Sequence, residues 1–290
     1  MGVGHLKPPV PFFLRQIFQA VIDAIFPLKC LVCGRFFHLP DVVEGRKTQF
    51  NAQIKHLNDD RDSPEFEKLL AVYLCSVCTK NFVSIESPFC SRCGIMFKGK
   101  EGDDHVCGDC LTSPGKFRLA RAPVVYDKVF MNIIHRFKYS GKVQLSKPLG
   151  ALLLAAFCRN WDTADIDLVI PVPLHNGRFK KRGFNQSFLL VQNWKKMAPA
   201  LKIELSHVQI EKDVLVRIRP TVPQIGLGRK ERLANIENAF GVRGPEKIEG
   251  KRILLIDDVY TTGATADECA RVLLNDGAEY VDVLTVARSL

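Results

Sequence analysis

The stretch RILLIDDVYTTGATADECARVLLNDGA, residues 252–278, decides the fold of this chain. Its residues 253–256 form an unbroken run of β-favouring apolar side chains. Such a run is typical of a central parallel strand that is covered on both faces. Two adjacent carboxylates, Asp257 and Asp258, follow directly and are expected at the carboxyl end of that strand.

A turn and a helix are predicted after these aspartates. Residues 261–265 supply the hydroxyl groups, and Gly263 the backbone freedom, of a tight turn. From Ala266 the apolar residues recur at helical spacing, and Gly277 is placed just past the end of the helix. Residues 279–289 predict another strand. The tip of this strand–turn–helix–strand unit lies where ligands bind in open α/β sheets.

The tip combines groups that suit a ribose 5-phosphate. The first turn of a helix has unpaired N–H groups and the positive end of the helix dipole, so it attracts a phosphate. Thr261, Thr262 and Thr265 add hydroxyl donors there. Asp257 and Asp258 would accept hydrogen bonds from the paired hydroxyls of a sugar. The alternative is an ordinary strand–turn–helix corner with solvated aspartates.

An apolar run, two aspartates and a Thr/Gly loop follow one another in the stretch 253–265. This order of features resembles the phosphoribosyl diphosphate (PRPP) signature of type I phosphoribosyltransferases. The resemblance implies an α/β fold in which helices flank a mostly parallel sheet. It also implies that Asp257 and Asp258 are the catalytic-site carboxylates and contact the ribose hydroxyls. The 5-phosphate would then be held by five loop residues: Thr261, Thr262, Gly263, Ala264 and Thr265.

A second region, IPVPLHNGRFKKRGFNQS at 170–187, also follows a predicted buried strand. Two prolines stiffen its turn, and dense positive charge comes next. In the type I family, the loop after the first core strand contacts the pyrophosphate of PRPP and its Mg²⁺, and a mobile basic segment closes over them. The resemblance assigns these PRPP-binding roles to Pro171, Val172, Pro173, Leu174, Arg178 and Arg182. The alternative is a basic turn on the surface.

Eight of the ten cysteines form four CxxC pairs: Cys30/Cys33, Cys75/Cys78, Cys90/Cys93 and Cys107/Cys110. Each pair can place two thiolates on one metal ion, and two pairs complete a tetrahedral zinc site. A glycine follows the first and third pairs, as a tight metal-binding knuckle favours, so we pair the first with the second and the third with the fourth. An interleaved arrangement and a module with only one zinc ion remain open. Disulfides would need an oxidising compartment, which nothing in the sequence indicates.

Further segments extend the resemblance to one subfamily. They are FKYSGK at 137–142, the region 170–187, RIRPTVPQIGLGRKERLANIENAF at 217–240 and the four cysteine pairs. Together they are similar to the ComF-type competence proteins, in which a double zinc ribbon is fused to a phosphoribosyltransferase domain. The resemblance covers nearly the whole chain and departs from the pattern at the long insertion between Cys33 and Cys75.

Three segments are predicted along the chain. Residues 1–28 form an amphipathic helix, residues 29–114 a double zinc ribbon with a polar insertion at 41–70, and residues 115–290 the α/β domain. The N-terminal helix is expected to pack on the zinc module, and the alternative is a membrane-surface or partner-binding helix. Charged residues interrupt it, so we do not expect a signal peptide or a transmembrane segment. We expect a cytoplasmic protein.

The α/β domain alternates between strand and helix patterns, which predicts a mostly parallel sheet. The expected strands lie at 117–127, 166–174 and 214–219 in addition to those above, and the expected helices at 128–142, 145–157, 186–198 and 229–240.

Positive charge is concentrated in one part of the chain. The net charge is +10, and residues 171–232 hold 13 Lys and Arg against 4 Asp and Glu, a net of +9. This concentration favours a site for polyanions such as pyrophosphate, nucleic acid or both. The alternative is a solvated basic face.

Three functions remain open at this level. The first is a ComF-type protein that binds PRPP and assists DNA uptake, with single-stranded DNA and a helicase-like translocase as partners. The second is an active phosphoribosyltransferase with an unidentified nitrogenous acceptor. The third is a non-enzymatic module that senses PRPP. No residue stands out as a base for a particular acceptor, and a fold does not name a substrate.

Overall fold

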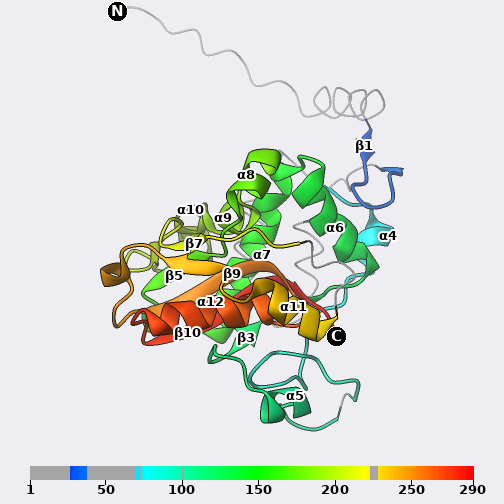
Figure 1. The fold of residues 1–290 in the computed structure, drawn as a ribbon. Helices are drawn as coiled ribbons and strands as arrows, with labels where there is room; N and C mark the ends of the chain where they lie inside the picture. Colours follow the sequence, from blue (N-terminus) through cyan, green and yellow to red (C-terminus); the bar gives the residue numbers. More distant parts are fainter. Residues whose placement is uncertain (1–26, 38–69, 72, 100, 223–227) are drawn as a thin grey trace, which may run out of the picture.

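The computed structural model of the chain describes five segments (Figure 1): residues 27–37, 70–71, 73–99, 101–222 and 228–290. Two of the predicted features fall mostly outside them. The N-terminal helix at 1–28 lies outside the described residues except for its last two positions, and the insertion at 41–70 except for its last. Both stay predictions.

A parallel sheet forms the centre of the molecule (Figure 1). Its strand order is β3–β10–β9–β5–β6, β4 also pairs with β10, and every pairing is parallel. The mostly parallel α/β fold is therefore confirmed. The strands are β3 (Ala120–Arg121), β4 (Val124–Val125), β5 (Leu168–Pro171), β6 (Gln209–Ile210), β9 (Arg252–Tyr260) and β10 (Tyr280–Arg288).

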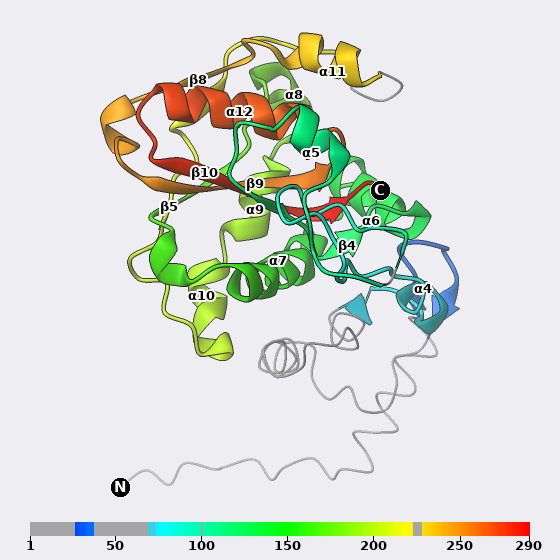
Figure 2. The same ribbon diagram turned by 90° about the horizontal axis from the view of Figure 1, so that it is seen from below.

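Both faces of the sheet are covered, which explains the unbroken apolar run in β9. Leu254 and Ile256 pack into the core on one face, and Ile253 and Leu255 into the core on the other. On the first face lie α6 (Lys128–Tyr139), α7 (Ser146–Asn160), α9 (Gln186–Val191) and α10 (Trp194–Met197). On the second face lie α11 (Arg229–Ile236), α12 (Ala264–Asn275) and a hairpin of β7 (Leu215–Arg217) and β8 (Phe240–Val242) (Figures 1 and 2).

The local structure differs from the sequence expectation in three places. The helix expected at 186–198 is divided into α9 and α10. The strand expected at 214–219 forms as β7, but it pairs antiparallel with β8 outside the central sheet. Pairing partners that are distant in sequence decide this, and periodicity does not reveal them.

The third difference concerns the basic segment that the family resemblance describes as a mobile loop. It forms α8 (Asn176–Arg182), which begins after His175 and ends at Gly183. The His175 ring nitrogen accepts from the backbone N–H of Gly177 at 3.2 Å, and Gly183 closes the helix with φ +83°. These two caps hold a short helix where charge density alone predicts a loop.

The zinc module packs against the edge of the sheet at β3 and β4 (Figure 2). The Ala120 amide donates to the Arg92 carbonyl at 2.7 Å, and the Val125 amide donates to the Val83 carbonyl at 2.8 Å. At Gly94 a Cβ would come within 2.6 Å of the Ala120 carbonyl oxygen, so the backbones meet closely. The module has β1 (Leu28–Lys29), β2 (Phe36–Phe37), α4 (Ser76–Thr79) and α5 (Gly108–Thr112).

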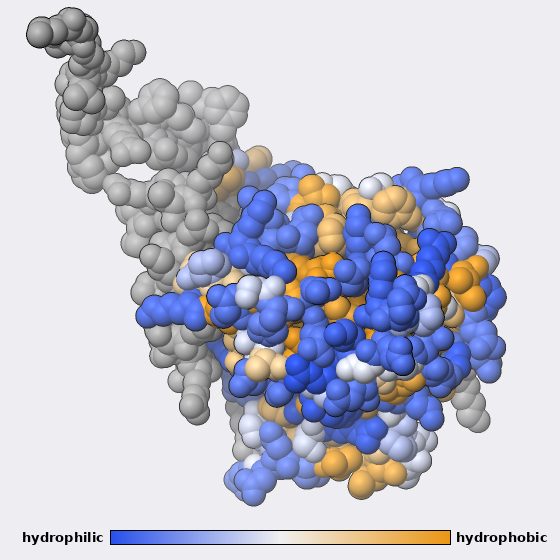
Figure 3. All heavy atoms as spheres, turned by 90° about the vertical axis from the view of Figure 1, so that its left-hand side faces the viewer, coloured by the Kyte–Doolittle hydropathy of each residue, from blue (hydrophilic) through white to orange (hydrophobic). Residues whose placement is uncertain are grey.

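Figure 3 shows the left-hand side of Figure 1, which faces away from the C-terminus. Hydrophilic side chains cover most of this face, and hydrophobic ones gather toward its middle. The aspartates at the carboxyl end of β9 belong to the other end of the strands, where ligands bind in sheets of this type.

Candidate functional site

Strand β9 delivers Asp257 and Asp258 to the carboxyl edge of the sheet. Asp258 is 3% exposed, and Asp257 is half-buried. The Ser187 hydroxyl of α9 donates to Oδ1 of Asp257 at 3.1 Å, and the Asp258 backbone N–H donates to the same oxygen at 2.8 Å. Two carboxylates are thus held side by side, one of them buried and the other half-buried.

A lysine from α6 compensates this negative charge. Lys138 Nζ donates to Oδ1 of Asp258 at 2.7 Å. Burial alone would lower the pKa of Lys138, but Asp258 and Asp257 raise it, so the side chain is cationic. Lys138 belongs to the segment FKYSGK, whose sequence pattern assigned it no role. The signal was present, because Lys138 lies four residues after Ile134 on the buried side of the helix.

Two buried acceptor or donor atoms at this edge are left unpaired. Within the described residues, Oδ2 of Asp258 and Oγ1 of Thr262 have no hydrogen-bond partner. A buried polar atom without a partner costs about 1–3 kcal/mol, so such atoms are expected where a ligand completes the site. Burial, followed by the charge of Asp258, raises the pKa of Asp257 to about 7. A cationic ligand would favour its ionised form.

The loop after β9 makes a tight turn at Gly263 and leads directly into α12. Gly263 has φ +81°, and a Cβ at this position would overlap the Tyr260 hydroxyl. Helix α12 begins directly afterwards at Ala264, two residues earlier than expected from its periodicity. The Arg232 guanidinium donates to Oγ1 of Thr261 at 2.9 Å and brings positive charge to the loop. Arg232 lies in the segment 217–240 of the family pattern, and its sequence context assigned it no role.

The predicted pyrophosphate loop lies beside the aspartates. Strand β5 pairs with β9 so that Pro171 is opposite Ile256, and the Val172 amide donates to the Ile256 carbonyl at 2.8 Å. Asn185 Nδ2 donates to the Val172 carbonyl at 3.1 Å and fixes the loop from α9. The structure therefore brings residues 171–174, 257–258 and 261–265 together at one edge of the sheet.

The two predicted arginines lie on α8 and make protein contacts. Arg178 donates to the Thr221 carbonyl at 2.8 Å, and Arg182 donates to the Gln186 side chain. Arg217 on β7 donates to the Thr221 hydroxyl, so Arg178 and Arg217 meet at the same residue. Burial, followed by the charge of Arg178, lowers the pKa of Arg217. Two like charges that approach one another favour an anion between them. The sequence pattern gave no sign that Arg217 takes part.

The first and second cysteine pairs form one cluster. The sulfurs of Cys30, Cys33, Cys75 and Cys78 lie within 4.8 Å of one another, and the Cys33 and Cys75 sulfurs are 3.7 Å apart. Four thiolates around a tetrahedral zinc ion are about 3.8 Å apart, so the donor set fits zinc. Cys30, Cys75 and Cys78 are buried in the same hydrophobic core as α6 and α7.

The third and fourth pairs form the second cluster. The sulfurs of Cys90, Cys93, Cys107 and Cys110 also lie within 4.8 Å of one another, and those of Cys93 and Cys107 are 3.8 Å apart. The predicted pairing is confirmed and the interleaved arrangement is wrong. The long insertion after Cys33 does not prevent the first cluster from closing, because the chain on both sides of it is anchored in the core.

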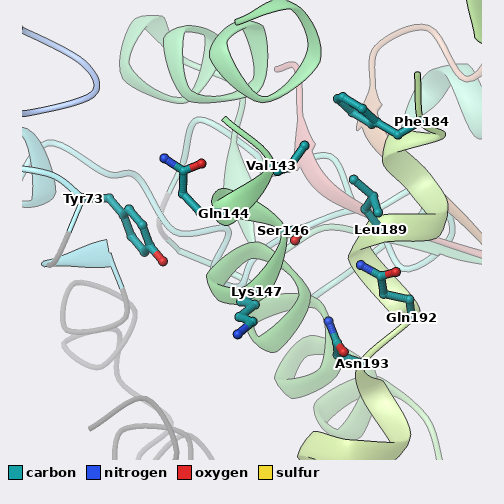
Figure 4. A pocket seen from close by; sticks show the side chains of 9 residues that line it. All are labelled: Tyr73, Val143, Gln144, Ser146, Lys147, Phe184, Leu189, Gln192 and Asn193. Atoms are coloured by element: carbon teal, nitrogen blue, oxygen red, sulfur yellow. The ribbon is translucent and has the colours of Figure 1, made fainter. Parts of the chain in front are cut away.

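A separate pocket of about 470 Å³ opens between α7 and α9 (Figure 4). The carboxamides of Gln192 and Asn193 and the ammonium group of Lys147 face it together with the rings of Tyr73 and Phe184. None of the predicted PRPP residues lines this pocket. The charged edge described above is therefore a different place on the molecule.

Comparison with known proteins agrees with this architecture. Residues 70–111 match the double zinc ribbon domain. The chain is 31% identical over 221 residues to the DNA utilization protein YhgH of Escherichia coli K12, which spans 75% of this chain and 91% of that protein. The chain belongs to the ComF family of competence proteins. It is also 29% identical to competence protein F of Haemophilus influenzae, in a match that covers 74% of this chain and 90% of that protein. Its identity to competence protein ComFC of Bacillus subtilis is 28%, and that match covers 74% of this chain and 84% of that protein.

Among solved structures, the ComF-family chain is similar to one titled as the allosteric regulatory enzyme of purine biosynthesis. The sequence identity is 21%, the TM-score is 0.28, and the match covers 49% of this chain and 25% of that one. A TM-score this low says nothing about function. The strand order and the two cysteine clusters define the fold.

Within the described part of the chain, no helix is long and apolar enough to cross a membrane.

Proposed function

We propose that this ComF-family protein binds PRPP, together with Mg²⁺, at the carboxyl edge of its parallel sheet. The observation that carries the proposal is the enclosed Asp257–Asp258 pair beside a glycine-hinged loop, with unpaired atoms on Asp258 and Thr262. Such a combination of buried acceptors and a helix N-terminus suits a ligand that carries both hydroxyl and phosphate groups.

Each part of the edge has a role in this proposal. Asp257 and Asp258 accept hydrogen bonds from the ribose hydroxyls, and residues 261–265 hold the 5-phosphate through backbone N–H groups and hydroxyls. Residues 171–174 contact the pyrophosphate and its Mg²⁺, with Arg178 and Arg182 nearby on α8. When bound, Mg²⁺ supplies positive charge that offsets the pyrophosphate oxygens. Lys138 donates to Oδ1 of Asp258, and Oδ2 of the same carboxylate remains available as an acceptor.

Isothermal titration with PRPP and Mg²⁺ tests the proposal. Replacing both Asp257 and Asp258 with Asn is expected to weaken binding by about 1–3 kcal/mol, because charge-assisted hydrogen bonds are lost. The matched control is Asp276→Asn, since Asp276 is exposed at the far end of α12. Equal affinity in the wild type and the double variant would mean that PRPP is not the ligand of this edge.

We further propose that the protein assists DNA uptake and handles single-stranded DNA, alongside a helicase-like translocase. The names of its relatives, DNA utilization protein and competence protein, support this role. The eight cysteines of the four pairs are placed to bind zinc, and we propose the reducing cytoplasm as the place of action because thiolate ligands persist there.

The basic segment offers a surface for a polyanion. Lys180 and Lys181 are exposed on α8, and Phe179, which precedes them on the same helix, is 48% exposed and available for stacking on a base. Trp194, which lies in the same basic segment, is excluded because it is 1% exposed and its Nε1 donates to the Gly150 carbonyl at 3.0 Å. The candidate DNA contact is therefore α8.

A gel-shift titration at two salt concentrations tests the DNA contact. Binding is expected to be weak, independent of sequence and steeply dependent on salt, because bound DNA releases counterions. The double variant Lys180→Glu/Lys181→Glu should weaken it. The control, Lys247→Glu/Lys251→Glu, makes the same charge change before β9, at the opposite end of the strands. Failure of the wild type to shift DNA at low salt would remove this part of the proposal.

An active phosphoribosyltransferase is the second candidate, because the approach of Arg178 and Arg217 at Thr221 would stabilise a leaving pyrophosphate. A screen for pyrophosphate release over nitrogenous acceptors tests it. Release with one acceptor would establish catalysis, whereas PRPP binding without release under any acceptor would favour a binding or sensing role.

A further inference from the structure

Arg288 connects the second cysteine cluster to the edge of the sheet. It is the last residue of β10, lies opposite Tyr260 of β9 and is 5% exposed. One guanidinium nitrogen, Nη2, donates to the Cys93 sulfur at 3.2 Å. The same guanidinium group lies over the Tyr260 ring, with its central carbon 4.2 Å from the ring centroid. A single side chain thus contacts a cluster ligand and the residue that precedes the 261–265 loop.

The surroundings of Arg288 require a negative partner. Among the described residues, its Nε and Nη1 atoms are buried without a hydrogen-bond partner. Burying an unpaired charge is costly. Four thiolates around Zn²⁺ carry a net charge of −2, because each cysteine ligand is deprotonated. The loaded cluster therefore supplies a counter-charge to the Arg288 guanidinium.

Tyr260 links Arg288 to the 261–265 loop. Its ring is 8% exposed and packs edge-on against Phe117, with centroids 6.0 Å apart. Its hydroxyl occupies the space that a Cβ would take at Gly263, the glycine that turns the chain into α12. A shift of the Tyr260 ring would consequently change the space available to the loop.

A second connection runs from the same ribbon to the first turn of α12. Arg92, between two cluster cysteines, donates to the carbonyls of Gly115 and Phe117 at 2.6 Å and 3.2 Å. The Lys116 amide in that segment donates to the carboxylate of Asp267 on α12. Both routes start in the second cluster and end at the start of α12.

The first cluster lies on the other face of the sheet. Cys30, Cys75 and Cys78 belong to the core with α6 and α7, whereas Tyr260, Phe117 and the beginning of α12 belong to the core on the opposite face. This separation predicts that the two clusters differ in their effect on the loop.

We propose that Arg288 is a positioning residue through which zinc in the Cys90–Cys93–Cys107–Cys110 cluster holds the 261–265 loop in its phosphate-receiving shape. The phosphate role of the loop rests on the proposed function, but the coupling itself does not. Because coupling between two sites is reciprocal in binding free energy, a phosphate ligand in the loop should also raise the zinc affinity of this cluster and not of the first.

Hydrogen–deuterium exchange on the full-length, zinc-loaded chain tests the coupling without any ligand. Arg288→Met removes the charge and keeps most of the volume, and Arg288→Lys keeps the charge. In Arg288→Met and in Cys110→Ser, residues 260–267 should exchange at least about fivefold faster than in the wild type, with a smaller change in Arg288→Lys. Exchange in α6 should stay unchanged and serves as the check that the variants are folded.

Cys33→Ser provides the matched control, because it removes a ligand of the first cluster. It should leave exchange in residues 260–267 at the wild-type rate. Equal acceleration by Cys33→Ser and Cys110→Ser would overturn the proposal in favour of general destabilisation. Unchanged exchange in a folded Arg288→Met variant would overturn the proposal outright. If that variant does not fold, unchanged exchange in both Arg288→Lys and Cys110→Ser would overturn it.

A titration of the wild type with PRPP and Mg²⁺ separates this inference from the proposed function. Faster loop exchange in Arg288→Met without PRPP binding to the wild type would support the coupling and reject PRPP as the ligand. PRPP binding with identical affinity and identical loop exchange in wild type and Arg288→Met would support the proposed function and reject the coupling.

Discussion

The cysteine clusters and the aspartate pair are both concentrations of negative charge, but they differ in how completely the protein itself supplies their partners. Each cluster brings four sulfurs to within 4.8 Å of one another, so the ligand set is complete within the protein. Asp257 and Asp258 have one lysine as a counter-ion, and the Oδ2 atom of Asp258 remains without a partner among the described residues.

This difference separates a structural site from a binding site. A tetrahedral set of four thiolates leaves no open position for a substrate, as is usual for structural zinc. The aspartate edge keeps acceptors unsatisfied and lies where the strands end, which is where a ligand can complete it.

Removing zinc should have the largest effect on the protein. We expect two zinc ions per chain by metal analysis, falling to one in Cys33→Ser and to one in Cys110→Ser. Structural zinc contributes about 10–16 kcal/mol of apparent binding energy in zinc-finger peptides, so chelation should lower stability strongly. Because three first-cluster cysteines share a core with α6 and α7, loss of the first zinc should loosen these two helices and leave the core on the opposite face of the sheet unchanged.

Cys158→Ser is the control for this experiment, since Cys158 belongs to neither cluster. It should retain two zinc ions. The opposite result would be zinc-free protein whose cysteines form disulfides by mass spectrometry. In that case the cysteine clusters would not be closed metal sites, and their contrast with the open aspartate edge would fail.

Breaking the Lys138–Asp258 pair should have the next largest effect. Lys138→Met leaves a buried carboxylate without its counter-ion, and we expect a loss of about 3 kcal/mol of unfolding free energy in urea. Lys128→Met, an exposed lysine at the start of the same helix, should change little. The double variant Lys138→Met/Asp258→Asn should recover part of the loss. Equal stability of the two single lysine variants would show that Lys138 does not compensate the aspartates.

Per pH unit, the smallest change in stability is expected from the titration of Asp257, which also distinguishes the aspartates from the thiolates. The pKa of Asp257 is raised to about 7 when folded, so the native state keeps a proton that the unfolded chain loses near its ordinary value of about 4. Stability should therefore fall as pH rises between about 4 and 7, by up to about 1.4 kcal/mol per pH unit, and level off above this window.

Urea denaturation across this pH window, in the wild type and Asp257→Asn, isolates the contribution. Both proteins carry the same zinc clusters, so any pH dependence of the metal sites is common to them. The Asn variant should show a flatter profile. Parallel profiles in the two proteins would mean that Asp257 does not hold its proton in the folded state.

Much of this arrangement is predictable from the sequence because its signals are local. The apolar run at 253–256, the aspartates after it and the glycine-containing turn define a strand, an edge and a loop within a few residues. The CxxC spacing defines knuckles in the same way, because two cysteines three residues apart can bind one ion without help from the rest of the chain.

The partners of these groups could not be predicted because they lie far away in the chain. Lys138 reaches Asp258 across 120 positions, and Arg288 reaches Cys93 across 195. The first cluster closes across the long segment after Cys33, and β7 pairs with β8 instead of joining the central sheet.

By itself, the sequence determined which residues carry the charge, the sulfur and the turn, because periodicity and spacing act over a few residues. Only the tertiary structure decided which buried charge meets which counter-ion. Electrostatic pairing in a low-dielectric interior depends on distances that packing sets, and it leaves no periodic trace along the chain. The link from Cys93 through Arg288 to Tyr260 is of this second kind.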